Sequence, residues 1–210
     1  MNIKKEIIKY SKFFEEHGFK LNTSLLRFEK VFPHGKQVIY ANITDGDNGK
    51  SIEYHLGIRI NTVEELIIKQ VPMVSFNPEQ SITFSQSLNK LRDSSTKKIK
   101  SLLKMNDPTD IHSKKDFFLN EGFKWLDQMI NPSRLQQEIS KLKEDSFESH
   151  NLVEKAFKVT ALSKLYNPNY YPILRQSFLE KINCNEMTPF TIASFLQFLN
   201  YLDNLKSEAA

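Results

Sequence analysis

Residues 51–60 read SIEYHLGIRI and form the most regular stretch of the chain. Apolar side chains occupy every second position, and the positions between them are polar, charged or glycine. This period of two indicates a β-strand with one buried face, because successive side chains of a strand point to opposite sides of the sheet. The residues predicted to face the core are Ile52, Tyr54, Leu56, Ile58 and Ile60.

Segments on both sides of this strand predict an antiparallel sheet. Two β-rich runs precede it and are joined by the short turn 33–35, and the turn DGDNG at 45–49 leads into the strand itself. Two more strands are expected after it, separated by a turn that contains proline. The four additional strands are expected at residues 25–32, 37–44, 73–76 and 81–88.

Segments with a helical period of apolar residues come before and after the predicted strands in the sequence. Residues 2–17 place apolar side chains three or four positions apart and are followed by Gly18, which indicates a helix with a glycine C-cap. A short helix is expected at 62–69, and after residue 107 the helical period continues to the end of the chain. The helices expected in that last part are at 112–130, 132–143, 146–166, 170–182 and 188–206.

The predicted fold class is therefore α+β, with an N-terminal helix and an antiparallel β-meander packed with a C-terminal all-helical half. The change of period places a domain boundary between residues 106 and 107. We expect an α+β sheet domain at 1–106 and a helical domain at 107–210, packed together as one unit.

The last predicted helix, 188–206, has almost no polar face. A helix that is apolar on nearly every side is either surrounded by its own chain or completed by another chain. A monomer that buries this helix is the simpler expectation, and a homodimer through residues 188–206 is the alternative.

Composition limits the compartment and the class of partner. A single cysteine, Cys184, cannot form an internal disulfide, and no apolar run approaches the roughly 18 residues that a membrane helix needs. The N-terminus lacks the apolar core of a signal peptide, so we expect a cytoplasmic protein that does not enter a membrane. The net charge of +4 comes from 29 basic and 25 acidic residues spread along the chain, which does not predict specific nucleic-acid binding.

Residues that carry chemistry do not gather into a recognisable motif. The five histidines lie far apart and none has a partner at metal-ligand spacing, so we expect neither a metal nor another cofactor. No set of acid, base and nucleophile is recognisable in the sequence, which favours a protein that is not an enzyme.

One set of polar residues is expected to lie close together in the fold. Glu53, His55 and Arg59 share the face of their strand opposite the apolar ladder, and Arg27 and Glu29 can join them from a neighbouring strand. A carboxylate, an imidazole and a guanidinium side by side could perform acid–base work or bind an anion. The same residues are also typical of a solvated sheet face with cross-strand ion pairs, and we favour that interpretation.

The stretches FFEEHGFK, LLRFEKVF, QVIYANI and YHLGIRI occur in this order within the first 90 residues. In this part the chain resembles a bacterial family of small α+β proteins of unknown function, which start with a helix, a Gly-Phe-Lys entry and a β-meander. Similar small proteins include immunity proteins and interaction partners encoded beside bacterial toxins. The resemblance implies a binding role and names no catalytic residue.

Two hypotheses for function follow. The first is a non-enzymatic bacterial protein–protein interaction module, immunity-like or otherwise partner-binding, whose partner is another protein. The second is a small enzyme or ligand-binding protein that uses the polar sheet face around Glu53, His55 and Arg59, with Arg27 beside them. A partly desolvated pocket around His55 would favour the second hypothesis, because an open sheet face cannot exclude water.

Overall fold

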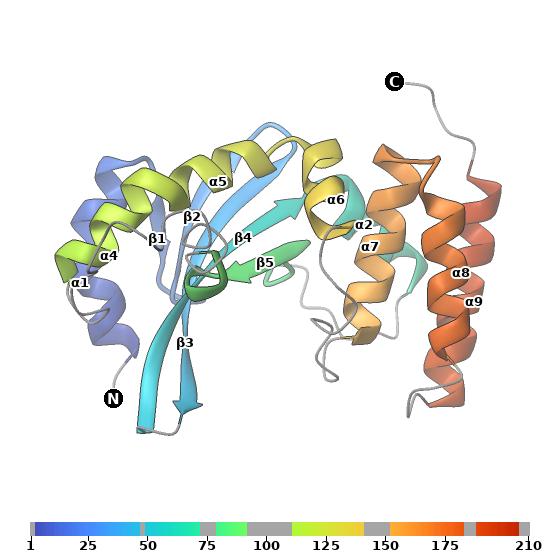
Figure 1. The fold of residues 1–210 in the computed structure, drawn as a ribbon, viewed down its shortest axis with the longest axis horizontal. Helices are drawn as coiled ribbons and strands as arrows, with labels where there is room; N and C mark the ends of the chain where they lie inside the picture. Colours follow the sequence, from blue (N-terminus) through green and yellow to red (C-terminus); the bar gives the residue numbers. More distant parts are fainter. Residues whose placement is uncertain are drawn as a thin grey trace, which may run out of the picture. The chain divides into compact units, whose positions relative to one another are not determined.

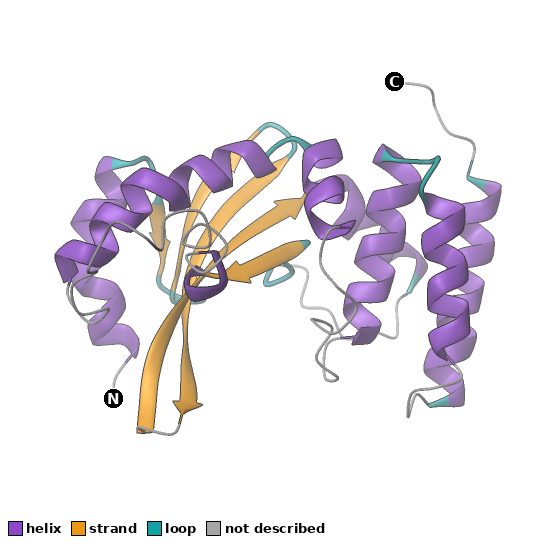
Figure 2. Ribbon diagram, in the orientation of Figure 1, coloured by secondary structure: helices purple, strands orange, loops and turns teal. Residues whose placement is uncertain are grey.

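The computed structural model describes residues 3–46, 49–71, 79–91, 111–140, 152–182 and 188–205. They form an N-terminal helix, a five-stranded antiparallel sheet and a helical C-terminal half (Figures 1 and 2). The predicted α+β fold class is confirmed.

The chain divides into two compact units, each made of two separate segments. Unit 1 comprises Met1–Ile60 and Ile82–Ile130, and unit 2 comprises Asn61–Ser81 and Asn131–Ala210. The predicted boundary between residues 106 and 107 lies outside the described residues. That boundary, and the packing of the two predicted domains as one unit, stay predictions.

The sheet of unit 1 is a meander in which each strand pairs antiparallel with the next along the chain. Its strands are β1 (Lys20–Asn22), β2 (Arg27–Phe32), β3 (Gly35–Gly46), β4 (Gly49–Ile60) and β5 (Phe84–Ser87). The strand expected at 81–88 is present as the shorter β5, and the one expected at 73–76 lies outside the described residues. β1 was not predicted, because its three residues are too few to show a period.

The first helix, α1 (Ile3–Glu16), is followed as predicted by a glycine C-cap at Gly18. Gly18 has φ +83°, and the backbone N–H groups of Gly18 and Phe19 donate to the carbonyls of Glu15 and Phe14 at 3.0 Å each. This left-handed C-cap satisfies carbonyls at the helix end and turns the chain into β1.

The core of unit 1 lies between the apolar face of the sheet and a layer of helices. As predicted, Tyr54, Leu56, Ile58 and Ile60 are buried, whereas Ile52 is only half-buried. Aromatic rings join the two layers, and Phe14 of α1 is central among them. Its ring centroid lies 4.6 Å from that of Phe28 on β2 and 5.0 Å from that of Phe118.

The helix predicted at 112–130 consists of α4 (Ile111–Phe117), a π-helical turn η1 (Phe118–Gly122) and α5 (Phe123–Met129). The wider turn directs Phe118 onto the sheet, where its ring meets Tyr54 edge-on at 5.9 Å. A Cβ at Gly122 would lie 3.1 Å from the Phe118 ring, so a glycine suits this close approach.

Unit 2 is helical, and α7 is its central helix. Its helices are α2 (Asn61–Gln70), α6 (Pro132–Ser140), α7 (Leu152–Tyr166), α8 (Tyr171–Ile182) and α9 (Pro189–Asn204). Each of the other four packs against α7. The eight residues 156–163 of α7 are all buried, which means that this helix has no solvated side over two turns.

The last helix, α9, buries one side only. Phe195 and Phe198 each lie 5.1 Å from the ring of Phe157 on α7, and Leu199 and Leu202 are buried beside them. The opposite side carries polar residues along with two exposed apolar side chains, Phe190 and Leu196. The apolar sequence of α9 therefore reflects burial against α7 and α8 within the unit, and the homodimer through residues 188–206 stays a prediction.

Two predicted helix starts are confirmed. The Asn131 side chain accepts a hydrogen bond from the Arg134 N–H at 3.1 Å, and Thr188 accepts one from the Thr191 N–H at 3.2 Å. In both cases a proline follows the capping residue at the first helical position. Within the described ranges, no helix combines the length and apolar character that crossing a bilayer requires.

Candidate functional site

The polar face of the sheet gathers the residues that the sequence analysis singled out. Strand alternation places Glu53, His55 and Arg59 on the side opposite the buried ladder. Residues paired across neighbouring antiparallel strands point to the same side, so the register adds the residues directly opposite. Tyr40 lies opposite His55 and Arg27, and Lys36 lies opposite Arg59.

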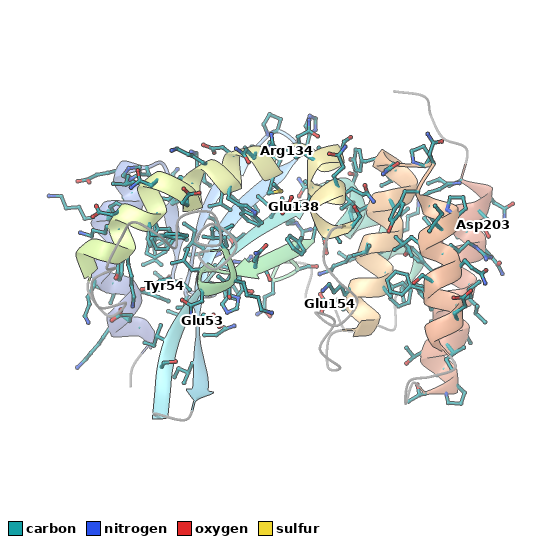
Figure 3. The ribbon with its side chains drawn as sticks, viewed as in Figure 1. Glu53, Tyr54, Arg134, Glu138, Glu154 and Asp203 are labelled. Atoms are coloured by element: carbon teal, nitrogen blue, oxygen red, sulfur yellow. The ribbon has the colours of Figure 1, made fainter. Side chains whose placement is uncertain are left out.

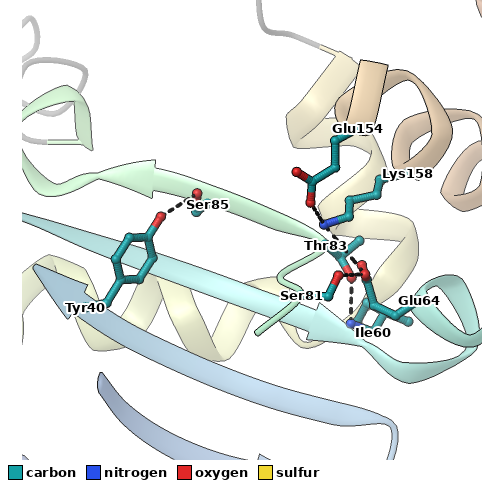
Figure 4. Close-up of polar contacts among 8 residues, drawn as sticks. All are labelled: Tyr40, Ile60, Glu64, Ser81, Thr83, Ser85, Glu154 and Lys158. Atoms are coloured by element: carbon teal, nitrogen blue, oxygen red, sulfur yellow. Dashed lines mark hydrogen bonds and ion pairs between the residues drawn. The ribbon is translucent and has the colours of Figure 1, made fainter. Parts of the chain in front are cut away.

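Around His55 the side chains form a connected cluster. The Tyr40 ring stacks on the imidazole with centroids 5.0 Å apart and planes inclined by 14°. The Tyr40 hydroxyl hydrogen-bonds to the hydroxyl of Ser85 at 3.0 Å (Figure 4). Glu53 Oε2 lies 3.6 Å from His55 Nε2, and Asn89 Nδ2 donates to Glu53 Oε1 at 3.1 Å. The cluster therefore holds the imidazole between a ring and a carboxylate.

Burial decides the protonation of His55. Its side chain is 18% exposed, and its Nε2 atom is shielded from solvent without a hydrogen-bond partner. Desolvation lowers the pKa of the imidazole, and the charge of Lys90 lowers it further, against the opposing effect of the Glu53 carboxylate. The net effect lowers the pKa of His55 below its ordinary value, which favours the neutral imidazole.

A second cluster lies on the same face around Glu29. Arg27 Nε donates to Glu29 Oε1 at 2.5 Å, and Lys36 Nζ donates to the same oxygen at 3.0 Å. Arg27 is buried, with 4% of its surface exposed. Desolvation would raise the pKa of Glu29, but the hydrogen bonds and charges of Lys36 and Arg27 outweigh it and lower the pKa.

The predicted site residues therefore fall into two groups. Glu53 and His55 lie together, whereas Arg59 lies at the far end of β4, beside Lys36. Arg59 is six positions after Glu53, which is about 20 Å along a strand. A role in binding stays a prediction for Glu53, His55, Arg59 and Arg27.

Two kinds of site residue escaped the sequence analysis. Tyr40 belongs to the strand predicted at 37–44 and Lys36 directly precedes it, and their place beside His55 and Arg59 depends on the register of β3 with β4. Asn89 follows β5 by two residues and has no periodic signal. Among the described residues, no group of three or more His, Cys, Asp or Glu side chains could hold a metal ion.

Strands β3 and β4 extend beyond the strands beside them and form a two-stranded arm. The last residue pair flanked by other strands is Tyr40 with His55, since β2 and β5 pair no further. Beyond it, residues 41–46 and 49–54 pair only with each other among the described strands. We call these two segments the arm. It extends past the body of unit 1, and Glu53 and Tyr54 mark its base (Figures 1 and 3).

Unit 2 contains a buried polar cluster that the sequence did not reveal. Lys158 of α7 forms an ion pair with Glu154 of the same helix and lies 3.6 Å from Glu64 of α2 (Figure 4). The Ser81 hydroxyl donates to the Glu64 carboxylate. The side chains of Lys158 and Glu64 are almost fully buried. The cluster joins α2, α7 and Ser81, which are far apart in the sequence.

Comparisons with protein-family models, with curated proteins and with solved structures found no match for this chain. Its function therefore has to be inferred from the polar face and the arm.

Proposed function

We propose that the protein is a non-enzymatic protein-binding module that engages its partner through the arm. The observation that carries this proposal is the length of the arm, which adds six residue pairs beyond the last pair flanked by β2 and β5. An isolated two-stranded hairpin is at best marginally stable in water. A partner strand that pairs with the arm stabilises it and uses backbone groups along its outer edges.

An apolar pair within the arm supports the same proposal. Ile43 and Ile52 are directly opposite each other on the side that continues the apolar ladder. Ile43 is 40% exposed, and Ile52 is half-buried. An apolar cross-strand pair that its own unit leaves partly open is suited to contact with the apolar side of a partner strand.

The resemblance of the first 90 residues to a bacterial family of small α+β proteins of unknown function fits this role, since similar small proteins include immunity proteins and interaction partners. An immunity-like protein binds one partner tightly, and a projecting arm offers both side chains and backbone for such binding.

The alternative, a small enzyme or ligand-binding protein that uses Glu53, His55 and Arg59 together, has weaker support. The lowered pKa of His55 favours a base at that position. Arg59, however, lies about 20 Å along the strand from Glu53, so one small ligand cannot contact all three side chains.

The arm can be tested with one point variant, one deletion and one matched control. Affinity capture from the native host identifies the partner, and calorimetry with the purified partner measures the dissociation constant. We expect Ile43→Asp to weaken binding at least about tenfold, since it places a charge in an apolar contact. Replacing residues 43–52 by Asn-Gly, a turn that closes the pair Asn42–Glu53, should abolish binding.

Val31→Asp is the control. Val31 is 80% exposed on β2 of the same unit, and its replacement should leave the affinity unchanged. All variants should retain the thermal unfolding midpoint of the wild type within a few degrees. A complex whose dissociation constant is the same with and without the arm would refute the proposal.

A further inference from the structure

The two long edges of the arm differ, and the edge formed by β3 is the more open of the two. On the apolar side of the arm, Ile43 of β3 is 40% exposed, whereas Ile52, opposite it on β4, is half-buried. The chain that follows β5 stays close to β4, because Asn89 Nδ2 donates to Glu53 Oε1 at 3.1 Å. A strand that approaches the arm therefore meets less of the described chain at β3 than at β4.

The edge of β3 is open because β2 begins only at Arg27. Arg27 is opposite Tyr40, and the residue before it, Leu26, has φ +49°. A leucine in this left-handed conformation does not extend a strand, and the conformation is uncommon for a bulky residue. Residues 23–26 connect β2 to β1, which lies on the side of β2 away from β3. This part of the chain therefore turns away from β3 at the base of the arm.

Residues 41–46 of β3 thus have backbone groups that face the position a longer β2 would fill. In a strand, the N–H and C=O groups of successive residues point to opposite edges, so every second residue of this segment directs both groups away from β4. Among the described strands, only β4 pairs with these residues. A strand edge of this kind is a template for pairing with another chain.

We infer that a β-strand of the partner protein pairs antiparallel with residues 41–46 of β3, in line with β2. This inference rests on the proposed binding role of the arm and specifies the edge and the direction. All strand pairs of the described sheet are antiparallel, and this arrangement is slightly more stable per residue than a parallel one. In such strand addition, main-chain hydrogen bonds supply affinity and alternate side chains supply specificity.

The side chains of β3 define the chemistry of the partner strand. Residues directly opposite on neighbouring strands share a face of the sheet. The partner residue opposite Ile43 should therefore be apolar, and the one opposite the exposed Asn42 should be polar. β4 already has this pattern, since it places Ile52 opposite Ile43 and Glu53 opposite Asn42. We expect the partner strand to alternate in the same way.

A synthetic peptide with the sequence of residues 49–54, Gly-Lys-Ser-Ile-Glu-Tyr, is a suitable probe, because its side chains match β3 in antiparallel register. Amide hydrogen exchange followed by NMR first identifies the fast-exchanging N–H groups of residues 41–46, which are those that point away from β4. At millimolar peptide we expect exchange of this set to slow at least about twofold, the effect of a ligand at its dissociation constant. The control peptide Gly-Lys-Ile-Ser-Glu-Tyr has the same composition but places isoleucine on the polar face, and it should have no effect.

A proline at one outward position tests the main-chain hydrogen bonds. Thr44 and Asp45 are consecutive, so the N–H of one of them points away from β4. Thr44→Pro or Asp45→Pro, whichever residue exchanges fast, removes that donor at a strand edge and should abolish the effect of the peptide. Thr44→Ala or Asp45→Ala, at the same position, keeps the donor and should leave the effect unchanged.

Three results would each overturn the inference: the first peptide does not slow exchange in residues 41–46, the two peptides act alike there, or the proline variant responds as the alanine variant does. These results are independent of the test of the proposed function, which compares partner binding with and without the arm. If loss of the arm abolishes partner binding while the peptide leaves residues 41–46 unaffected, the binding role stands and strand addition at β3 is excluded.

Discussion

His55 shows how one residue takes its properties from three strands. β4 supplies the imidazole, β3 supplies the Tyr40 ring that stacks on it, and β5 supplies Ser85, which is hydrogen-bonded to Tyr40. The resulting burial lowers the pKa, which makes His55 a residue that resists protonation in the folded state.

This lowered pKa predicts a dependence of stability on pH. Below pH 6.5 the unfolded chain binds a proton at His55 before the folded chain does, so the free energy of unfolding falls as the pH drops toward the folded pKa. Urea unfolding at several values between pH 7.5 and 5 should therefore show a weaker pH dependence for His55→Gln than for the wild type. An NMR titration that places the pKa of His55 at or above 6.5 would contradict this prediction.

Gly35 is a second residue defined by its neighbours, whose atoms leave no space for a side chain. A Cβ at this position would lie 1.8 Å from the Arg59 carbonyl oxygen and 3.0 Å from the Phe32 ring. Gly35→Ala must therefore push β3 and β4 apart, and we expect a loss of about 3 kcal/mol in the free energy of unfolding. Val31→Ala, at an exposed position of the same hairpin, should change it by less than about 0.5 kcal/mol. Equal effects of the two substitutions would argue against the close approach.

At the scale of elements, α7 is held by charge as well as by apolar packing. Its residue Lys158 is buried between Glu154 and Glu64. Lys158→Met leaves a carboxylate in the interior without its ammonium, and we expect it to cost about 3 to 5 kcal/mol of stability.

The double variant Lys158→Met, Glu64→Met tests the interaction itself. Removing both buried charges should cost less than removing Lys158 alone, because no buried carboxylate of α2 is left without its ion pair. Denaturant unfolding measures both values. Additive losses would show that Lys158 and Glu64 do not interact.

Elements with a regular period could be predicted from the sequence, and the others could not. β4 alternates over residues 51–60, and two helix starts carry Asn-Pro or Thr-Pro, so each was recognisable locally. The buried Lys158 looks like any solvated lysine in the sequence, because its burial depends on α2, some 90 residues earlier. Strand alternation was enough to place His55 and Arg59 on one face of β4. Their separation into two clusters was not predictable, because it depends on the neighbouring residues that β3 and β5 contribute.

For the whole molecule, the exposed side of α9 bears on self-association. Phe198 is buried against Phe157, so a charge at Phe198 would disrupt unit 2 itself. Leu196 is exposed and is the better probe of an interface. We expect sedimentation equilibrium at micromolar concentration to give 24.5 kDa for both the wild type and Leu196→Glu. Twice that mass for the wild type, reduced by Leu196→Glu, would establish a homodimer instead.

The alternation of the two units along the chain has a consequence for biosynthesis. The segment 61–81 leaves the ribosome long before the rest of unit 2, and α2 carries Val63, Glu64 and Ile67, which are buried in the finished protein. At about 5 to 20 residues per second, roughly 5 to 20 s pass before α7 has been translated. During that interval α2 exposes an apolar surface and an unpaired carboxylate on a nascent chain.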